Sequence, residues 1–179
     1  MNAQQHPMGT KPILPLLISM SLPPIVSMLI QSLYNIVDSI FVAQLRENAL
    51  TAVSLAFPLQ NIVLSVAVGL GVAINAIIAR SLGAQDIKAA NQVAMHGFLL
   101  TGIHSILFVF VGLFLTQPFL RMFTQNAEIF EMACQYSYLV ICFSFGSLFH
   151  ILIEKIFQAS GNMVIPMVLQ WVGALINII

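Results

Sequence analysis

Long apolar runs separated by short polar connections dominate this chain. Each run is close to the roughly 20 residues that a helix needs to cross a bilayer, so each predicts a membrane-spanning helix. The pattern therefore predicts an all-α polytopic membrane protein with about five transmembrane helices. A polar tail over residues 1–12 precedes them. The expected helices cover residues 13–45, 50–79, 90–115, 127–157 and 163–179.

Composition agrees with the pattern and excludes several classes of protein. Apolar residues make up 59% of the chain and charged residues 7%, and the mean hydropathy is +0.97. A soluble domain has about a quarter of its residues charged. Six basic and six acidic residues give zero net charge. No basic stripe exists to neutralise phosphates, so nucleic acid is not an expected partner.

A carboxylate lies inside the first apolar run. Asp38 follows Ser27, Gln31 and Asn35 at spacings of three and four residues, which puts all four on one helical face. A charged side chain at the bilayer centre costs about 2.5 kcal/mol or more, so such residues usually line a bundle interior and mark an ion or substrate path. The alternative is an interfacial position, because Arg46 follows eight residues later.

The basic residues predict an orientation. Four of them fall on one side of the membrane and two on the other, which favours a cytoplasmic N-terminus in the inner (plasma) membrane. The last run, from Met163 to Ile179, ends without a polar flank, so we expect the chain to be the front part of a longer protein. The basic residues on the first side are Lys11, Arg80, Lys88 and Lys155, and those on the second side are Arg46 and Arg121.

Other polar residues have a structural and a functional interpretation, and the structural one is favoured. His150 and Glu154 lie one turn apart and can be metal ligands, but they lack the paired histidines of a zinc helix. With Lys155 they fit an interfacial polar cluster near the cytoplasmic end of the predicted helix better. Asn61 and Asn75 fit a cavity lining and interhelical hydrogen bonds equally well. On this interpretation the bundle interior holds one acidic residue, Asp38, and no basic one.

The connections carry recognisable signals. Asn126 with Glu128 predicts a helix start, since both complement free N–H groups. Gly161–Asn162 predicts a turn. Cys134 and Cys142 share one predicted helix about 12 Å apart, too far for a disulfide. His96 and His104 are expected in packing or at the lipid interface, and the nine methionines mainly in packing, although methionine also suits promiscuous apolar sites.

Four segments together resemble the multidrug and toxic compound extrusion (MATE) family of secondary transporters. They are SLPPIVSMLIQSLYNIVDSIFVAQL at 21–45, ARSLGAQD at 79–86, EMACQYSYLVI at 131–141 and QASGNMVIPMVLQWVGALINII at 158–179. The resemblance implies a fold of twelve helices in two six-helix lobes. This chain would be the N-terminal lobe without its sixth helix.

The resemblance also implies roles for particular residues. Asp38 and Asn177 match positions of the family's cation-coupling site, and Gln31 and Tyr34 match positions that face the cavity of the lobe. Asn35 shares that polar face. A helix 1 proline at which bending is thought to accompany protonation matches Pro23. The aspartate and hydroxyl that complete the cation site in the best-described pattern would lie beyond Ile179.

The expected function is export of organic cations or drugs in exchange for H⁺ or Na⁺, with no enzymatic activity and no cofactor. The expected partners are membrane lipid, a small organic cation and a missing C-terminal half. One alternative is a lipid-linked saccharide flippase of the same superfamily, which would place basic residues in the cavity. Another is a membrane-assembly module that transports nothing alone, and an intramembrane metalloenzyme is a more distant one. The sequence leaves open the substrate, the coupling ion and the origin of the truncation.

Overall fold

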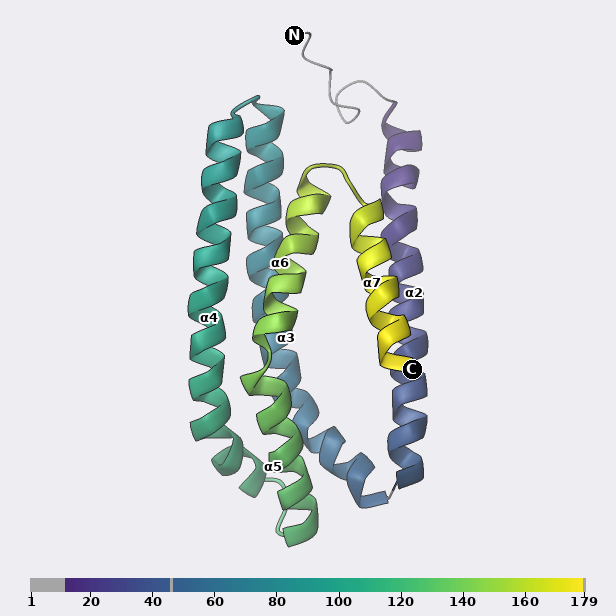
Figure 1. The fold of residues 1–179 in the computed structure, drawn as a ribbon, viewed down its shortest axis with the longest axis vertical. Helices are drawn as coiled ribbons and strands as arrows, with labels where there is room; N and C mark the ends of the chain where they lie inside the picture. Colours follow the sequence, from purple (N-terminus) through teal and green to yellow (C-terminus); the bar gives the residue numbers. More distant parts are fainter. Residues whose placement is uncertain (1–11, 46, 179) are drawn as a thin grey trace.

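The computed structural model describes residues 12–45 and 47–178 (Figure 1). Within those residues every element is a helix, and short turns connect them, so the predicted all-α class is confirmed. The expected tail at 1–12 lies almost wholly outside the described residues. Some side chains inside the helices are also outside the description: those of Tyr34, Asp38, Val42, Ala43, Leu45, Glu47, Asn177 and Ile178.

Six helices follow one another along the chain. Two of the expected helices are longer than their apolar runs: the one expected at 50–79 covers 47–83, and the one expected at 90–115 covers 87–121. Both extend past the apolar core because polar and charged residues at their ends can reach the interface while remaining helical. The bounds are α2 Ile13–Leu45, α3 Glu47–Gly83, α4 Ile87–Arg121, α5 Ala127–Cys142, α6 Phe145–Ala159 and α7 Val164–Ile178.

The single helix expected at 127–157 is broken in two. α5 and α6 meet at an angle of 42°, with Phe143 and Ser144 in a turn between them. The backbone N–H of Ser144 bonds to the carbonyl of Ile141, three residues back, instead of four. Serine and glycine are poor helix formers and are common at kinks. The segment Ser144-Phe-Gly146-Ser therefore carried a signal for this break.

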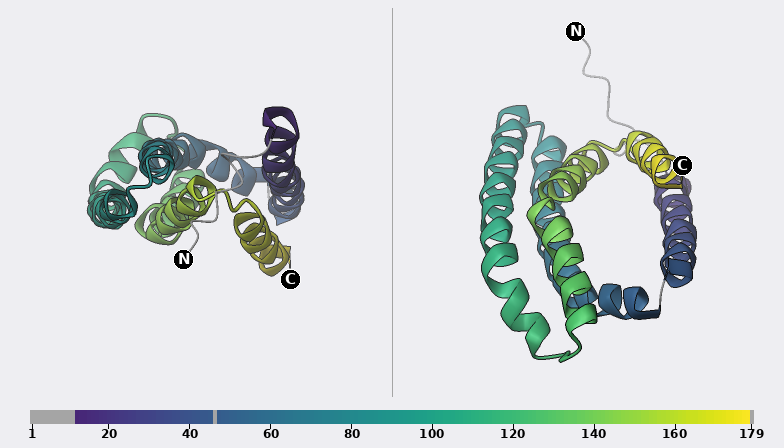
Figure 2. Two further views of the ribbon diagram at one scale, coloured as in Figure 1. Left: turned by 90° about the horizontal axis from the view of Figure 1, so that it is seen from above. Right: turned by 60° about the horizontal axis from the view of Figure 1, so that its bottom comes forward.

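The helices form two groups. α3 packs against α4, α5 and α6, and α2 packs mainly against α7. Figures 1 and 2 show the α2–α7 pair to one side of the other four helices. The core of the larger group is apolar and spans α3, α4, α5 and α6. It contains Leu59, Val63, Ala67, Phe108, Ile141 and Leu148.

The surface fits a membrane. Among the described residues, α2, α3 and α4 are each long and apolar enough to cross a bilayer, and the bent α5–α6 pair makes a fourth candidate span. α7 is apolar but shorter. Large apolar side chains lie exposed along the helices, for example Leu29, Phe110 and Phe114. In water such a surface would favour association, whereas in lipid it is the expected outer face.

Turns and caps position the helix ends. The Oδ1 atom of Asn126 accepts hydrogen bonds from the backbone N–H groups of Glu128 and Ile129 at 3.0 and 3.3 Å, so the predicted helix start is confirmed. Gly161 has a φ of 83°, which glycine adopts at little cost, and the turn expected at 161–162 is present. Asn162 then caps α7.

Candidate functional site

The first and last helices are joined by a hydrogen bond between two amide side chains. Nε2 of Gln170 on α7 donates to Oε1 of Gln31 on α2 at 3.1 Å. Both side chains are half-buried. Gln31 was expected to line a cavity of the lobe, and the structure puts it in the seam between α2 and α7. A polar pair between two otherwise apolar helices gives the seam a fixed register.

α2 and α7 run in the same direction along this seam. Both descend in Figure 1, from the end of the molecule where the α6–α7 turn lies. Seven residues beyond Gln31 is Asp38, and seven residues beyond Gln170 is Asn177. Two full turns of helix therefore bring the backbones of Asp38 and Asn177 to one depth, about 10 Å past the glutamine pair. The side chains of both residues, and that of Tyr34, lie outside the described residues.

The other expected residues of α2 have different environments. Ser27 is buried and Pro23 is half-buried, whereas the side chain of Asn35 is exposed. The backbone carbonyl of Asn35 accepts a hydrogen bond from the Ser39 hydroxyl at 2.8 Å. α2 continues as one helix through Pro23 and Pro24. Proline lacks a backbone N–H, so the helix is one hydrogen bond weaker at each of these positions.

A second polar cluster lies between α3 and α6. Glu154 and Lys155 lie in the second half of α6, within the helix predicted at 127–157, and their side chains are 22% and 21% exposed. Asn75 of α3 donates to the backbone carbonyl of Lys155 at 2.7 Å. The seam between α3 and α6 therefore contains a half-buried basic residue, whereas the sequence predicted no basic residue in the bundle interior. The interhelical interpretation of Asn75 is confirmed.

The side chains of this cluster form a network on α6. Nζ of Lys155 donates to Oε1 of Gln158 at 2.9 Å and lies 3.4 Å from Oε1 of Glu154. Nε2 of Gln158 donates to the same Glu154 oxygen at 2.7 Å. The sequence contained the necessary spacing, because residues 154, 155 and 158 share one side of a helix. Their position beside α3 was not visible in it.

Two more interhelical hydrogen bonds were not expected from the sequence. Nε2 of Gln60 on α3 donates to the Tyr136 hydroxyl on α5 at 3.1 Å. Nδ2 of Asn48 donates to Oε2 of Glu128 at 3.0 Å and joins the starts of the same two helices. Each pair is separated by nearly eighty residues, so no local spacing in the sequence points to it.

The histidines and cysteines form no composite site in the described part of the chain. The Nδ1 atoms of His96 and His104 each bond to a carbonyl of their own helix, at 2.7 and 2.8 Å. Cys134 is buried and Cys142 is half-buried, and neither is in a disulfide. No group of three or more His, Cys, Asp or Glu residues in the described ranges can hold a metal ion.

These features define the class of the protein: a helical, multi-pass membrane protein with polar side chains in the seams of its bundle. The MatE family model matches residues 23–179. The chain therefore belongs to the MATE family of membrane transporters, as its four sequence segments predicted.

Two curated relatives match along most of the chain. The chain is 24% identical over 177 residues to the FAD transporter of Shewanella oneidensis, and the match covers 98% of this chain and 39% of that protein. It is 29% identical over 166 residues to the multidrug and toxin extrusion protein 1 of Xenopus tropicalis, where the match covers 90% and 28%. The chain thus spans less than half the length of the curated relatives that it matches.

Solved structures show the same fold. A crystal structure of a MATE proline-to-alanine mutant superposes with a TM-score of 0.90 at 26% identity, and the match covers 97% of this chain and 39% of the other. The MATE multidrug transporter DinF-BH gives a TM-score of 0.86 at 28% identity, with coverage of 98% and 40%. The described helices are therefore the N-terminal portion of a MATE fold.

Proposed function

We propose that this chain is the N-terminal part of an exporter that moves organic cations or drugs out of the cell in exchange for H⁺ or Na⁺. The observation that carries the proposal is the seam between α2 and α7. The Gln31–Gln170 hydrogen bond fixes the register of two parallel helices, and that register brings the backbones of Asp38 and Asn177 to one depth. A carboxylate with a neighbouring amide oxygen suits a proton or a small hard cation.

The proposed mechanism uses competition at Asp38. Burial raises the cost of an unpaired carboxylate, so Asp38 binds either the coupling ion or a cationic substrate, and not both productively. Tyr34 and Asn35 would line the substrate path beside Gln31. Pro23 lies 15 residues before Asp38, so a bend there would tilt the whole second half of α2. Tilting would expose Asp38 to alternate sides of the membrane.

The remainder of the transporter is a required partner in this proposal. In MATE transporters the substrate path runs between two lobes, and one lobe cannot offer alternating access by itself. The N-terminus would lie in the cytoplasm, since more basic residues fall on that side of the predicted spans. The lobe would work in the plasma membrane, with lipid around its apolar face.

Replacement of Asp38 by asparagine tests the proposal in the protein as it is produced in the cell. Asparagine keeps the shape of the side chain and removes its charge and its titration. We expect ion-coupled efflux of a fluorescent organic cation to be lost, while the amount of protein in the membrane is unchanged. Asp86→Asn at the α3–α4 turn is the matched control, because that carboxylate caps α4 outside the apolar run. Undiminished efflux in Asp38→Asn would contradict the proposal.

A second candidate function is the export of an anionic substrate. The half-buried Lys155 favours it, because a basic residue inside the lobe can meet a phosphate group. A relative named as an FAD transporter supports the same possibility. Glu154 and Gln158 already neutralise and bind this ammonium group, so we rank it second. Uptake of FAD into inverted vesicles, without uptake of an organic cation, would reverse the ranking.

A further inference from the structure

The Glu154–Lys155–Gln158 network, which we call the α6 triad, has the features of an exchangeable cation site. Its carboxylate is loosely paired: the Lys155 ammonium lies 3.4 Å from Glu154 but 2.9 Å from Gln158. Both donors of the triad approach the same oxygen, Oε1 of Glu154. The Oε2 atom of Glu154 receives no hydrogen bond from the described part of the chain. A group with a long ion pair and a free oxygen can accept another cation.

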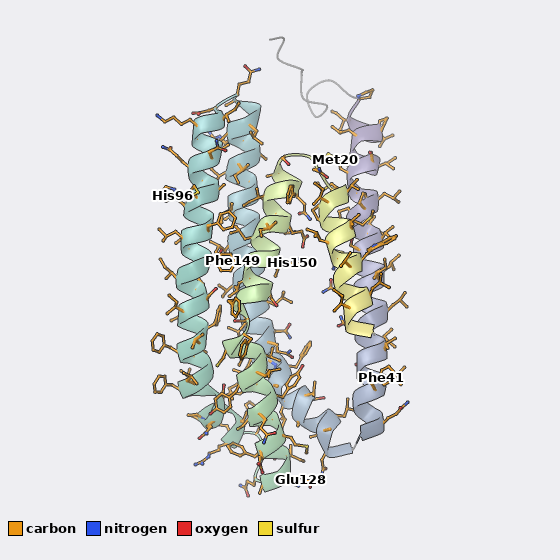
Figure 3. The ribbon with its side chains drawn as sticks, viewed as in Figure 1. Met20, Phe41, His96, Glu128, Phe149 and His150 are labelled. Carbon is orange, nitrogen blue, oxygen red and sulfur yellow. The ribbon has the colours of Figure 1, made fainter. Side chains whose placement is uncertain are left out.

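The depth of the triad matches that of the glutamine pair. Glu154 lies five residues before the end of α6 at Ala159, and Gln170 lies six residues after the start of α7 at Val164. Because one short turn joins these helices, both residues lie about 8–9 Å below it. Figure 3 shows Phe149 on the side of α6 toward α4 and His150 on the side toward α7. Glu154 follows His150 by one turn and shares that side.

The backbone beneath the triad is firmly held, and only the head groups are free to exchange partners. Asn75 binds the carbonyl of Lys155 at 2.7 Å. The stem of Lys155 crosses Gly71 so closely that a Cβ added there would lie 2.8 Å from its Cγ. The stem is therefore fixed against α3, while the ammonium group has two alternative oxygen partners within reach.

We propose that Glu154 is a second cation-binding carboxylate of the lobe and that Lys155 is a tethered cation that occupies it until an organic cation displaces it. This inference rests on the proposed function, because it assumes that organic cations enter the lobe. Displaced from Glu154, the Lys155 ammonium keeps its hydrogen bond to Gln158, and at 21% exposure it can also reach solvent. The ligand class is a monovalent organic cation, with apolar substituents that match the surrounding side chains.

Equilibrium binding of radiolabelled tetraphenylphosphonium to the protein in nanodiscs tests the proposal. If Lys155 competes with the ligand, Lys155→Gln should tighten binding by roughly two- to fivefold, the range that the free energy of a partly exposed ion pair gives. Glu154→Gln should weaken binding by a similar factor. The double variant should bind like Glu154→Gln, because the effect of Lys155 requires the carboxylate. A merely structural pair would give weaker binding in both single variants.

The chain offers a matched control in α5. Glu131 accepts a hydrogen bond from Gln135, also four residues on, at 3.4 Å, but it is exposed and has no lysine neighbour in the sequence. Glu131→Gln should leave the dissociation constant unchanged. If a single variant does not fold, the double variant, in which both charges are replaced, still tests the proposal. Replacing both members of an ion pair leaves no unpaired buried charge. Wild-type affinity in the double variant would overturn the proposal.

The two proposals fail separately. Loss of efflux in Asp38→Asn together with wild-type binding in Glu154→Gln and Lys155→Gln would overturn the role of the α6 triad alone. Unchanged efflux in Asp38→Asn would overturn the proposed coupling at α2, whatever the triad does. If Lys155→Gln binds the ligand more tightly and the double variant does so too, the proposed competition is wrong. The double variant has no carboxylate at position 154 for which Lys155 and the ligand could compete.

Discussion

Gln170 donates a hydrogen bond to Gln31 across 139 residues of sequence, at 3.1 Å. This bond joins the first described helix to the last and holds α2 from the α7 side, whereas few of the side chains described for α2 are buried. Ser27 is buried in α2, but the large apolar side chains around it are mostly exposed. The hydrogen bond between Gln170 and Gln31 is therefore one identifiable contribution to the attachment of α2.

Removal of the amide pair should loosen α2. Gln170→Ala and Gln31→Ala should each lower the free energy of unfolding, and a double-mutant cycle should give a coupling of about 0.6 kcal/mol, the average for interhelical hydrogen bonds in membranes. Unfolding in a denaturing detergent, followed by circular dichroism, measures this. Gln135→Ala is the control, because that exposed amide contacts only its own helix. A coupling energy of zero would contradict the role of the pair in the seam.

Asn75 and Asn61, which the sequence could not distinguish, should behave differently. Asn75 binds a backbone carbonyl of α6 at 2.7 Å, whereas Asn61 is exposed on α3. We expect Asn75→Ala to destabilise the protein by about 1 kcal/mol and Asn61→Ala by much less. Thermal unfolding in one detergent compares the two variants. Equal losses would show that the hydrogen bond to Lys155 contributes nothing specific.

Close packing at Gly97 should not tolerate a larger side chain. A Cβ on Gly97 would lie 2.8 Å from Cδ1 of Ile74 and 3.1 Å from Cδ1 of Leu152, whereas a Cβ on Gly102 meets nothing within 4 Å. We expect Gly97→Val to cost about 1–3 kcal/mol through overpacking between α3, α4 and α6. Gly102→Val on the same helix is the control for the loss of glycine. If both variants unfold at the same temperature, the packing argument is wrong.

The proposed mechanism requires α2 to bend at Pro23. Pro23→Ala supplies the missing backbone N–H and should stiffen α2. We expect organic-cation efflux to fall severalfold, with little change in the dissociation constant of the substrate. Efflux from vesicles and equilibrium binding measure the two quantities separately. Pro58→Ala in α3 is the control, since that proline is exposed in a neighbouring helix. Full efflux activity in Pro23→Ala would remove the hinge from the mechanism.

The sequence predicted the helices well because membrane burial imposes a simple rule. Long apolar runs must form helices in lipid, where every backbone group needs an internal partner. The run at 13–45 and its helix have the same bounds. The break between Cys142 and Phe145 was missed because its residues are as apolar as those of a continuous span. The serine and glycine that favour the kink are weak signals inside a hydrophobic run.

The candidate site was only partly predictable. Gln31 and Asp38 stand out because polar residues are rare in an apolar run, and helical periodicity puts them on one face. The partnership of Gln31 with Gln170 depends on tertiary packing, which no local pattern contains. Glu154 and Lys155 were predicted near the end of their helix, but the hydrogen bond from Asn75 to the Lys155 carbonyl, which holds this segment against α3, also depends on tertiary packing. In Figure 1 the α6–α7 turn lies lower along the long axis of the molecule than the α3–α4 turn, a difference that no local pattern predicts.

Because α2 and α7 share a register, the number of residues between Gln170 and Asn177 is constrained. One residue inserted between Gln170 and Asn177 would rotate every later position by about 100° and advance it by about 1.5 Å. The backbone position of Asn177 would then no longer share the depth and register of Asp38, even though its chemical identity is kept. An insertion in the turn at residues 160–163, ahead of the seam, leaves the spacing of seven residues intact. Insertions should therefore leave the register intact when they fall in the turn before α7, and should disrupt it when they fall within α7.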